Sequence, residues 1–145
     1  MIKVIIGSDH GGFEYKLKLL FHLLSLGYEV YDAGTFTHES CDYPIYGENV
    51  ARYVSNGNAD FGIVICTSGE GICMAANKVS GVRCGIGYND EVTALMRQHN
   101  DANVISFGAS FMSYEDVERR THIFLGTKFE GGRHQRRVDL INKIK

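Results

Sequence analysis

The feature that most constrains the fold is a continuously apolar run that ends directly in a glycine-rich turn. Phe61–Cys66 reads FGIVIC, and residues 67–71 that follow read TSGEG. A short apolar, β-branched run without alternation is typical of a strand in a parallel sheet that is covered on both faces. Parallel neighbours require crossover connections, which are usually helices. The chain is therefore expected to alternate strands with helices.

The rest of the sequence repeats this pattern. A second β-branched run at residues 3–8 also ends in a turn, Ser8-Asp9-His10-Gly11-Gly12, and helical periodicity starts at Phe13 and stops at Gly27. We expect strands at residues 3–8, 29–31, 61–66, 82–86 and 103–107, and a loop at 34–44. We expect helices from 13, at 45–54, 72–78, 90–99 and 114–124, and a last one that runs to 145.

This alternation predicts an α/β fold: a single-domain doubly wound sheet of about five parallel strands, Rossmann-like, with helices on both faces. The length of 145 residues fits one domain, residues 1–145. The final helix has only a thin apolar stripe, at Val138, Ile141 and Ile144. It is expected to pack on its own domain or on a neighbouring subunit.

Composition and charge exclude several classes of protein. With 44% hydrophobic and 22% charged residues the chain is of globular type. No apolar run approaches the roughly 18 residues of a membrane span, and the N-terminus lacks a secretory signal, so we expect a cytoplasmic protein without membrane partners. Residues 119–145 hold eight Lys or Arg against two acidic residues. This end favours anions, either as a phosphate site or simply as a solvated face, and the acidic remainder disfavours nucleic acid.

The cysteines and histidines give no sign of a metal or cofactor. Cys41, Cys66, Cys73 and Cys84 form no C-x-x-C pair, and the six histidines show no ligand spacing, so four free thiols and no metal are expected. The sequence has no P-loop, and Met74 occupies the position where a dinucleotide fingerprint needs its third glycine. We assign Cys73 and Cys84 to the core and expect no role for Cys41.

Cys66 is the strongest candidate for chemistry. Ligands of open α/β sheets bind at the carboxyl ends of strands, where both polar turns are expected. The glycines at residues 69 and 71 allow backbone N–H groups to converge on an anion, although a plain strand-to-helix turn has the same composition. A thiol at the start of this turn has its pKa lowered by the amides and the helix dipole. Cys66 is therefore a candidate base or nucleophile, with a buried core thiol as the alternative.

Other candidates are cationic or titratable side chains. His99, at a helix end, is suited to general acid–base catalysis, although helix dipoles also favour histidine there. His10 suits an anion contact or an ordinary turn. Arg133 and Arg137 are four residues apart on one helix face, which suits a phosphate, with solvated charges as the alternative and Arg136 as another partner for Arg133.

Six motifs taken together resemble one family, the type B ribose-5-phosphate isomerases, over essentially the whole chain. The sister branch of that family is the galactose-6-phosphate isomerase subunits. In chain order the motifs are GSDHGGF at 7–13, DYP at 42–44, CTSGEGI at 66–72, AANK at 75–78, RQHNDAN at 97–103 and FEGGRH at 129–134.

The resemblance implies an aldose–ketose isomerase without metal or cofactor, which interconverts ribose 5-phosphate and ribulose 5-phosphate through an enediolate. Cys66 resembles the base that moves the proton between C1 and C2. His99, with Asp9 nearby, resembles the ring-opening acid or base. The remaining implied site residues are the oxyanion cradle Thr67, Ser68, Gly69, Glu70 and Gly71, the sugar contact Asn100, the pocket wall Tyr43, and the phosphate ligands His10, Arg133 and Arg137.

The family is also dimeric or tetrameric, as a dimer of dimers, and the resemblance implies a homodimer in which His99 and Asn100 contribute to the partner's site. Two positions depart from the family pattern: Ser110 replaces a usual phosphate-binding Arg, and Thr67 replaces a common Gly. Three alternatives remain: a 6-phosphohexose isomerase, acting on allose or galactose 6-phosphate; a noncatalytic sugar-phosphate-binding module; and a thiol redox protein. The last requires a resolving cysteine, and Cys73 is not expected to fill that role for Cys66.

Overall fold

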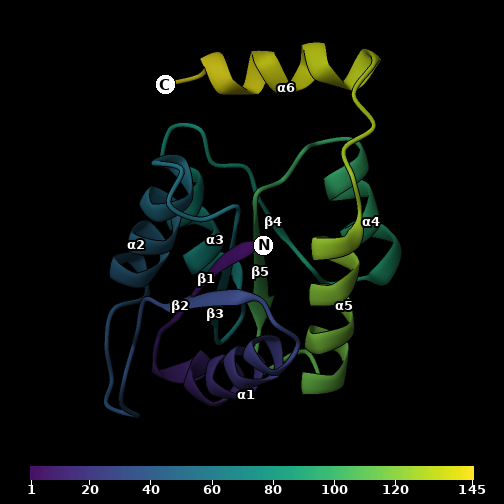
Figure 1. The fold of residues 1–145 in the computed structure, drawn as a ribbon. Coiled ribbons are helices and arrows are strands. Elements are labelled where there is room, and N and C mark those ends of the chain that lie inside the picture. Colours follow the sequence, from purple (N-terminus) through teal and green to yellow (C-terminus); the bar gives the residue numbers. More distant parts are fainter.

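Five parallel strands form one sheet in the computed structural model, which describes residues 1–145 (Figure 1). The strand order is β2-β1-β3-β5-β4. The strands are β1 (Lys3–Ser8), β2 (Glu29–Asp32), β3 (Phe61–Cys66), β4 (Cys84–Ile86) and β5 (Val104–Gly108). The chain crosses from β1 outward to β2 and then returns to the other side of β1 to form β3. Strand order therefore reverses between β1 and β3, which makes this the crevice where ligands of open α/β sheets bind.

Six α-helices connect and cover the strands. They are α1 (Phe13–Ser25), α2 (Tyr43–Ser55), α3 (Glu70–Asn77), α4 (Asp90–Gln98), α5 (Tyr114–Gly126) and α6 (Arg133–Lys143), and one 3-10 turn, η1 (His10–Gly12), precedes α1. The starts of α2 and α3 differ from those expected from the sequence. Pro44 lies in the first turn of α2, where a missing N–H costs nothing, and not in a loop. Helix α3 begins at Glu70, two residues earlier than expected, and so places its N-terminus directly behind the Cys66 turn.

The sheet is buried on both faces, which confirms the doubly wound prediction. On β3, Ile63 and Ile65 join the core formed with α1, α4 and α5, whereas Val64 and Cys66 join the core formed with α2 and α3. Full burial of such an aliphatic side chain contributes about 2 kcal/mol relative to exposure. Successive side chains of β3 thus alternate between the two cores. The sequence does not show this alternation, because both faces of the strand are apolar.

Helix α1 contains a buried charge that the sequence pattern placed between the apolar positions. Lys16 has no exposed surface, and its Nζ lies 2.6 Å from Oδ1 of Asp32 at the end of β2. The ammonium group also lies 5.3 Å from the centroid of the Phe13 ring and 5.4 Å from that of Phe36. The ion pair and the rings together replace the water that a lysine normally keeps.

Helix α6 lies apart from the rest of the fold, at the top of Figure 1. Only His134 and Val138 of this helix are buried, and Leu140 and Ile141 remain exposed. Its packing against a partner subunit, expected from the sequence, stays a prediction. None of the helices combines the length and the apolar character needed to cross a bilayer.

Candidate active site

The turns after β1 and β3 meet at the carboxyl edge of the sheet. Ser8 is in register with Ile65, and Cys66 is in register with Gly108. A Cβ atom on Gly11 would overlap Oγ1 of Thr67, so the two turns touch. The structure therefore brings together the two polar turns that the sequence singled out.

Cys66 ends β3 with only 4% of its surface exposed. Its Sγ accepts a hydrogen bond from the backbone N–H of Gly69 at 3.2 Å. Gly69 has φ of 82°, and a Cβ there would lie 2.9 Å from the backbone N of Gly108, so only glycine fits. A backbone donor and the adjacent N-terminus of α3 therefore both lie beside this sulfur.

Asp9 is fixed in the neighbouring turn. Its side chain is 5% exposed, and Oδ1 accepts the backbone N–H groups of Gly11 at 2.9 Å and Gly12 at 3.2 Å. These bonds cap the short η1 turn and hold the carboxylate in one place. Asp9 and Cys66 consequently lie at the ends of two adjacent strands, β1 and β3.

The cradle after Cys66 is held from two sides. The Ser68 hydroxyl accepts the N–H of Glu70 at 3.2 Å, and the Ser106 hydroxyl, which the sequence analysis missed, donates to the Gly69 carbonyl at 2.6 Å. The sequence signal that could have revealed Ser106 is its position as the one polar residue in the otherwise apolar strand β5. The ring of Tyr43 lies where a Cβ on Gly71 would come within 2.5 Å, and it is 40% exposed, which fits a pocket wall.

His10 projects beside this turn with a defined hydrogen bond. Its Nδ1 accepts the backbone N–H of Cys41 at 3.2 Å, and the side chain is exposed. An acceptor at Nδ1 places the ring proton on Nε2 in the neutral form. His10 therefore presents a donor toward solvent, which suits an anionic ligand.

His99 and Asn100 lie at the opposite edge of the sheet. They precede β5, and the carbonyl of the nearby Asn103 accepts the N–H of Gly62 at the start of β3. From Val104 to Gly108, which is in register with Cys66, the strand advances four residues, or about 13 Å. Within one chain, His99 is thus remote from Cys66 and Asp9.

His99 belongs to a second cluster that the sequence did not reveal. Its ring stacks on that of His134 with centroids 4.2 Å apart and an interplanar angle of 13°. Oε1 of Glu130 lies 3.9 Å from Nε2 of His99 and 3.7 Å from Nε2 of His134. Burial, and then the charges of His99 and Arg133, lower the pKa of His134. Arg133 begins α6, and Arg137 follows one turn later, both exposed.

This second cluster is not built like a metal centre. Its ligand atoms lie within 4.8 Å of one another, which would suit an ion. The in-plane lone pairs of two nearly parallel rings, however, do not converge on one point, as tetrahedral coordination requires. Two guanidinium groups nearby also disfavour a cation. The cluster instead suits an anionic ligand beside a titratable imidazole.

Comparison with known proteins decides the family. Residues 4–141 match the family model described as Ribose/Galactose Isomerase. The chain belongs to the ribose/galactose isomerase family. Its relatives in this family include ribose-5-phosphate isomerase B of Escherichia coli strain K12, which is 43% identical over 144 residues, covering 99% of this chain and 97% of the relative.

Solved structures of the ribose/galactose isomerase family show the same fold. Ribose-5-phosphate isomerase B of Clostridium thermocellum superimposes with a TM-score of 0.96 at 42% identity, covering 98% of this chain and 96% of the other. The Mycoplasma genitalium enzyme, solved with bound ribulose-5-phosphate, gives a TM-score of 0.94 at 39% identity, with 98% and 95% covered. The family expected from the six motifs is confirmed.

Proposed function

We propose that residues 1–145 act as a single isomerase domain that interconverts D-ribose 5-phosphate and D-ribulose 5-phosphate. Membership of the ribose/galactose isomerase family supports this reaction. So do the names of two relatives that are 43% and 39% identical over nearly the whole chain. The observation that carries the chemistry is the Cys66 thiol, buried at a strand end and hydrogen-bonded to the Gly69 amide. This thiol, which lies beside the N-terminus of α3, is the proposed base.

The isomerisation moves one proton along the sugar. In the proposed mechanism Cys66 removes the proton from C2 of the open-chain aldose and returns it to C1. The intervening enediolate carries negative charge, which the N-terminus of α3 and the amides of Thr67, Ser68 and Gly71 stabilise. The N–H groups of Gly69 and Glu70 already donate to Cys66 and Ser68, and so they shape the cradle. Proton transfer of this kind contributes about 10² to 10⁴ in rate. No step needs a hydride carrier.

Residues around the base hold the substrate. Tyr43 forms a wall at Gly71, and His10 offers an Nε2 donor to the phosphate. Asp9, with its carboxylate fixed by two amides, accepts a hydroxyl proton of the sugar and assists ring opening. Ser68 acts through the cradle, because its hydroxyl fixes the Glu70 N–H.

The remaining proposed residues require a second chain. His99, Asn100, Arg133 and Arg137 lie at or beyond the other edge of the sheet from Cys66. A complete site therefore forms when the amino edge of one copy faces the carboxyl edge of another, and in a two-fold dimer this happens twice. We propose a homodimer, alone or paired into a tetramer, in which His99 opens the sugar ring and the arginines bind phosphate. The four free cysteines support a reducing, cytoplasmic location.

A second substrate class is favoured by Ser110. Its backbone N–H donates to the Thr67 carbonyl at 3.0 Å, so it borders the cradle, and its side chain is small and exposed. The type B enzymes that this chain resembles usually have an Arg at this position, and that Arg helps to hold the substrate phosphate. A serine leaves more room for the longer chain of a 6-phosphohexose, such as allose or galactose 6-phosphate.

A substrate panel tests the proposal. Purified protein with a chelator present is assayed with ribose 5-phosphate, allose 6-phosphate and galactose 6-phosphate, beside Cys66→Ala. We expect ribose 5-phosphate to turn over fastest, with activity insensitive to the chelator. Faster turnover of a hexose phosphate would favour the second class. Sugar binding without any entry of solvent deuterium at C1 or C2 would instead indicate a noncatalytic module.

A further inference from the structure

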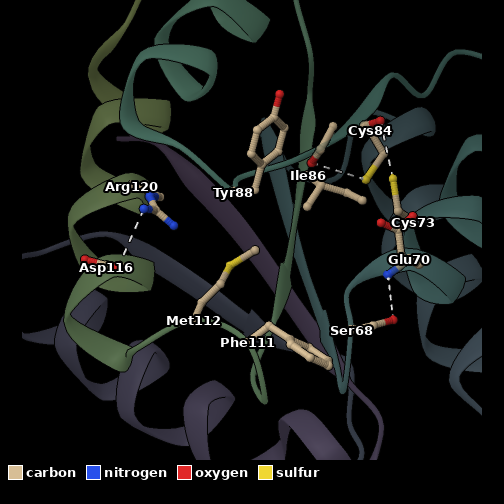
Figure 2. A pocket seen from close by; sticks show the side chains of 11 residues that line it. Ser68, Glu70, Cys73, Cys84, Ile86, Tyr88, Phe111, Met112, Asp116 and Arg120 are labelled. Atoms are coloured by element: carbon tan, nitrogen blue, oxygen red, sulfur yellow. Dashed lines mark hydrogen bonds and ion pairs between the residues drawn. The ribbon is translucent and has the colours of Figure 1, made fainter.

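A cavity of about 840 Å³ lies beside the edge strand β4, next to the proposed cradle (Figure 2). Ser68 and Glu70 line it near the Cys66 turn, and Cys73 of α3 and Cys84 of β4 line it farther along. The sequence predicts both cysteines in the core, and Cys73 is buried while Cys84 packs against the core formed with α2 and α3. The structure also places these two residues, 11 positions apart in the chain, on the wall of one cavity.

The two cysteines are locked together by one amide side chain. Sγ of Cys73 lies 3.5 Å from the carbonyl oxygen of Cys84. The Asn77 side chain donates to that carbonyl at 2.9 Å and to Sγ of Cys73 at 3.6 Å, and it accepts the N–H of Cys84 at 2.8 Å. Helix α3 and strand β4 are thereby fixed at the point where the cysteines face each other.

No comparable geometry joins Cys84 to the proposed base. Cys84 is in register with Val104 and Cys66 with Gly108, so they lie at opposite ends of the neighbouring strand β5, about 13 Å apart along it. A disulfide needs Cα atoms within about 7 Å of each other. Cys84 therefore cannot pair with Cys66, whereas its backbone carbonyl lies within 3.5 Å of Sγ of Cys73.

The two thiols differ in acidity. The hydrogen bond with the Cys84 side chain lowers the pKa of Cys73, against the opposing effects of burial and Glu70. The same interaction and burial raise the pKa of Cys84. An oxidant reacts with the more readily formed thiolate, and a second thiol resolves the product.

We propose that Cys73 and Cys84 are a redox modification site, which a hydroperoxide entering this cavity converts to a reversible disulfide. The Cys73 thiolate attacks one oxygen of hydrogen peroxide, the O–O bond breaks, and the hydroxide released takes a proton to become water. Cys84 then attacks the resulting sulfenic acid. The S–S bond forms as the S–O bond breaks, and the leaving hydroxide takes the Cys84 proton as the second water. The two sulfurs lose two electrons in all, and the peroxide gains them.

Peptide mapping of the intact wild-type chain tests this site. The protein is treated with hydrogen peroxide, free thiols are alkylated, and trypsin and a glutamyl endopeptidase are applied. Cleavage after Glu70 separates Cys66 from Cys73, and cleavage after Lys78 and Arg83 separates Cys73 from Cys84. We expect residues 71–78 to be disulfide-linked to the peptide that begins at Cys84, and dithiothreitol to release them.

Matched serine variants complete the experiment. Cys73→Ser and Cys84→Ser should each abolish the cross-link, whereas Cys41→Ser should leave it intact. Wild type also provides a readout that depends on no variant: oxidation should raise Tm by a few degrees, and dithiothreitol should reverse the rise. A cross-link through Cys66, or alkylatable Cys73 and Cys84 after oxidation, would overturn the proposal. None of these measurements depends on the isomerase activity.

Discussion

Nζ of Lys16, whose side chain has no exposed surface, lies 2.6 Å from Oδ1 of Asp32. Oδ1 of Asp32 also accepts the N–H of Gly34 at 2.9 Å. One carboxylate thus compensates a buried cation on α1 and caps the turn that follows β2. Because Asp32 is partly exposed and Lys16 is not, loss of the carboxylate leaves the more costly unpaired charge.

Asp32→Asn should therefore lower the free energy of unfolding by about 3 kcal/mol. Urea denaturation followed by circular dichroism measures the change. Lys16→Met should cost less, because a solvated Asp32 remains, and Asp32→Asn in the Lys16→Met background should cost little. Equal effects of Asp32→Asn in both backgrounds would show that the pair is not coupled.

Cys66→Ala should reduce kcat for ribose 5-phosphate by at least about 10²-fold. KM should change little, because the thiol transfers the proton in the chemical step and does not hold the substrate. Cys84→Ser, assayed under reducing conditions, is the matched control and should retain activity. Steady-state kinetics on both variants, with circular dichroism to verify folding, provide the check. Unchanged kcat in Cys66→Ala contradicts the assignment of the base.

The separation of His99 from Cys66 predicts complementation between inactive variants. Cys66→Ala and His99→Asn should each be inactive alone. Unfolded together and refolded as a mixture, half of the dimers would carry one intact site, so about a quarter of wild-type activity should return. Activity that stays absent in a mixture shown to contain mixed dimers would refute a site shared between chains.

Asp90, at the start of α4, should make the free energy of unfolding depend on pH. Hydrogen bonds from Arg119 and then Arg120 lower the pKa of Asp90 to about 2. A depressed folded-state pKa contributes stability that is complete above the unfolded value of about 4 and is lost as pH falls through about 2. Asp90→Asn should flatten the pH dependence of unfolding between these limits, measured by denaturant titration at several pH values. An identical slope in the variant would contradict this.

The strands were the most predictable part of the fold. β1 and β3 match their expected limits because the apolar run and the turn chemistry agree at each end. β4 was expected from Val82 but begins at Cys84. Val82 and Arg83 are held by contacts remote in sequence, such as the Asn103 side chain, which accepts the Arg83 N–H at 2.8 Å. Local patterns do not contain such partners.

The candidate site was predictable where it lies on strand ends. Cys66 and Asp9 follow β-branched runs, so parallel topology alone brought them to one edge. The stacking of His99 on His134 joins residues 35 positions apart, with β5 and α5 between them in the chain, so no local periodicity predicts it. The helical periodicity that starts at Phe13 does not reveal the buried Lys16, because the compensating Asp32 lies on a different element.

Helix α6 buries only two of its side chains against its own chain, yet it holds both proposed phosphate arginines. Under the proposed two-chain site, ligand affinity and subunit association are then linked by mass action, since each phosphosugar bound bridges two polypeptides. Dilution would weaken sugar binding, and saturating sugar would hold the assembly together at concentrations where empty chains separate.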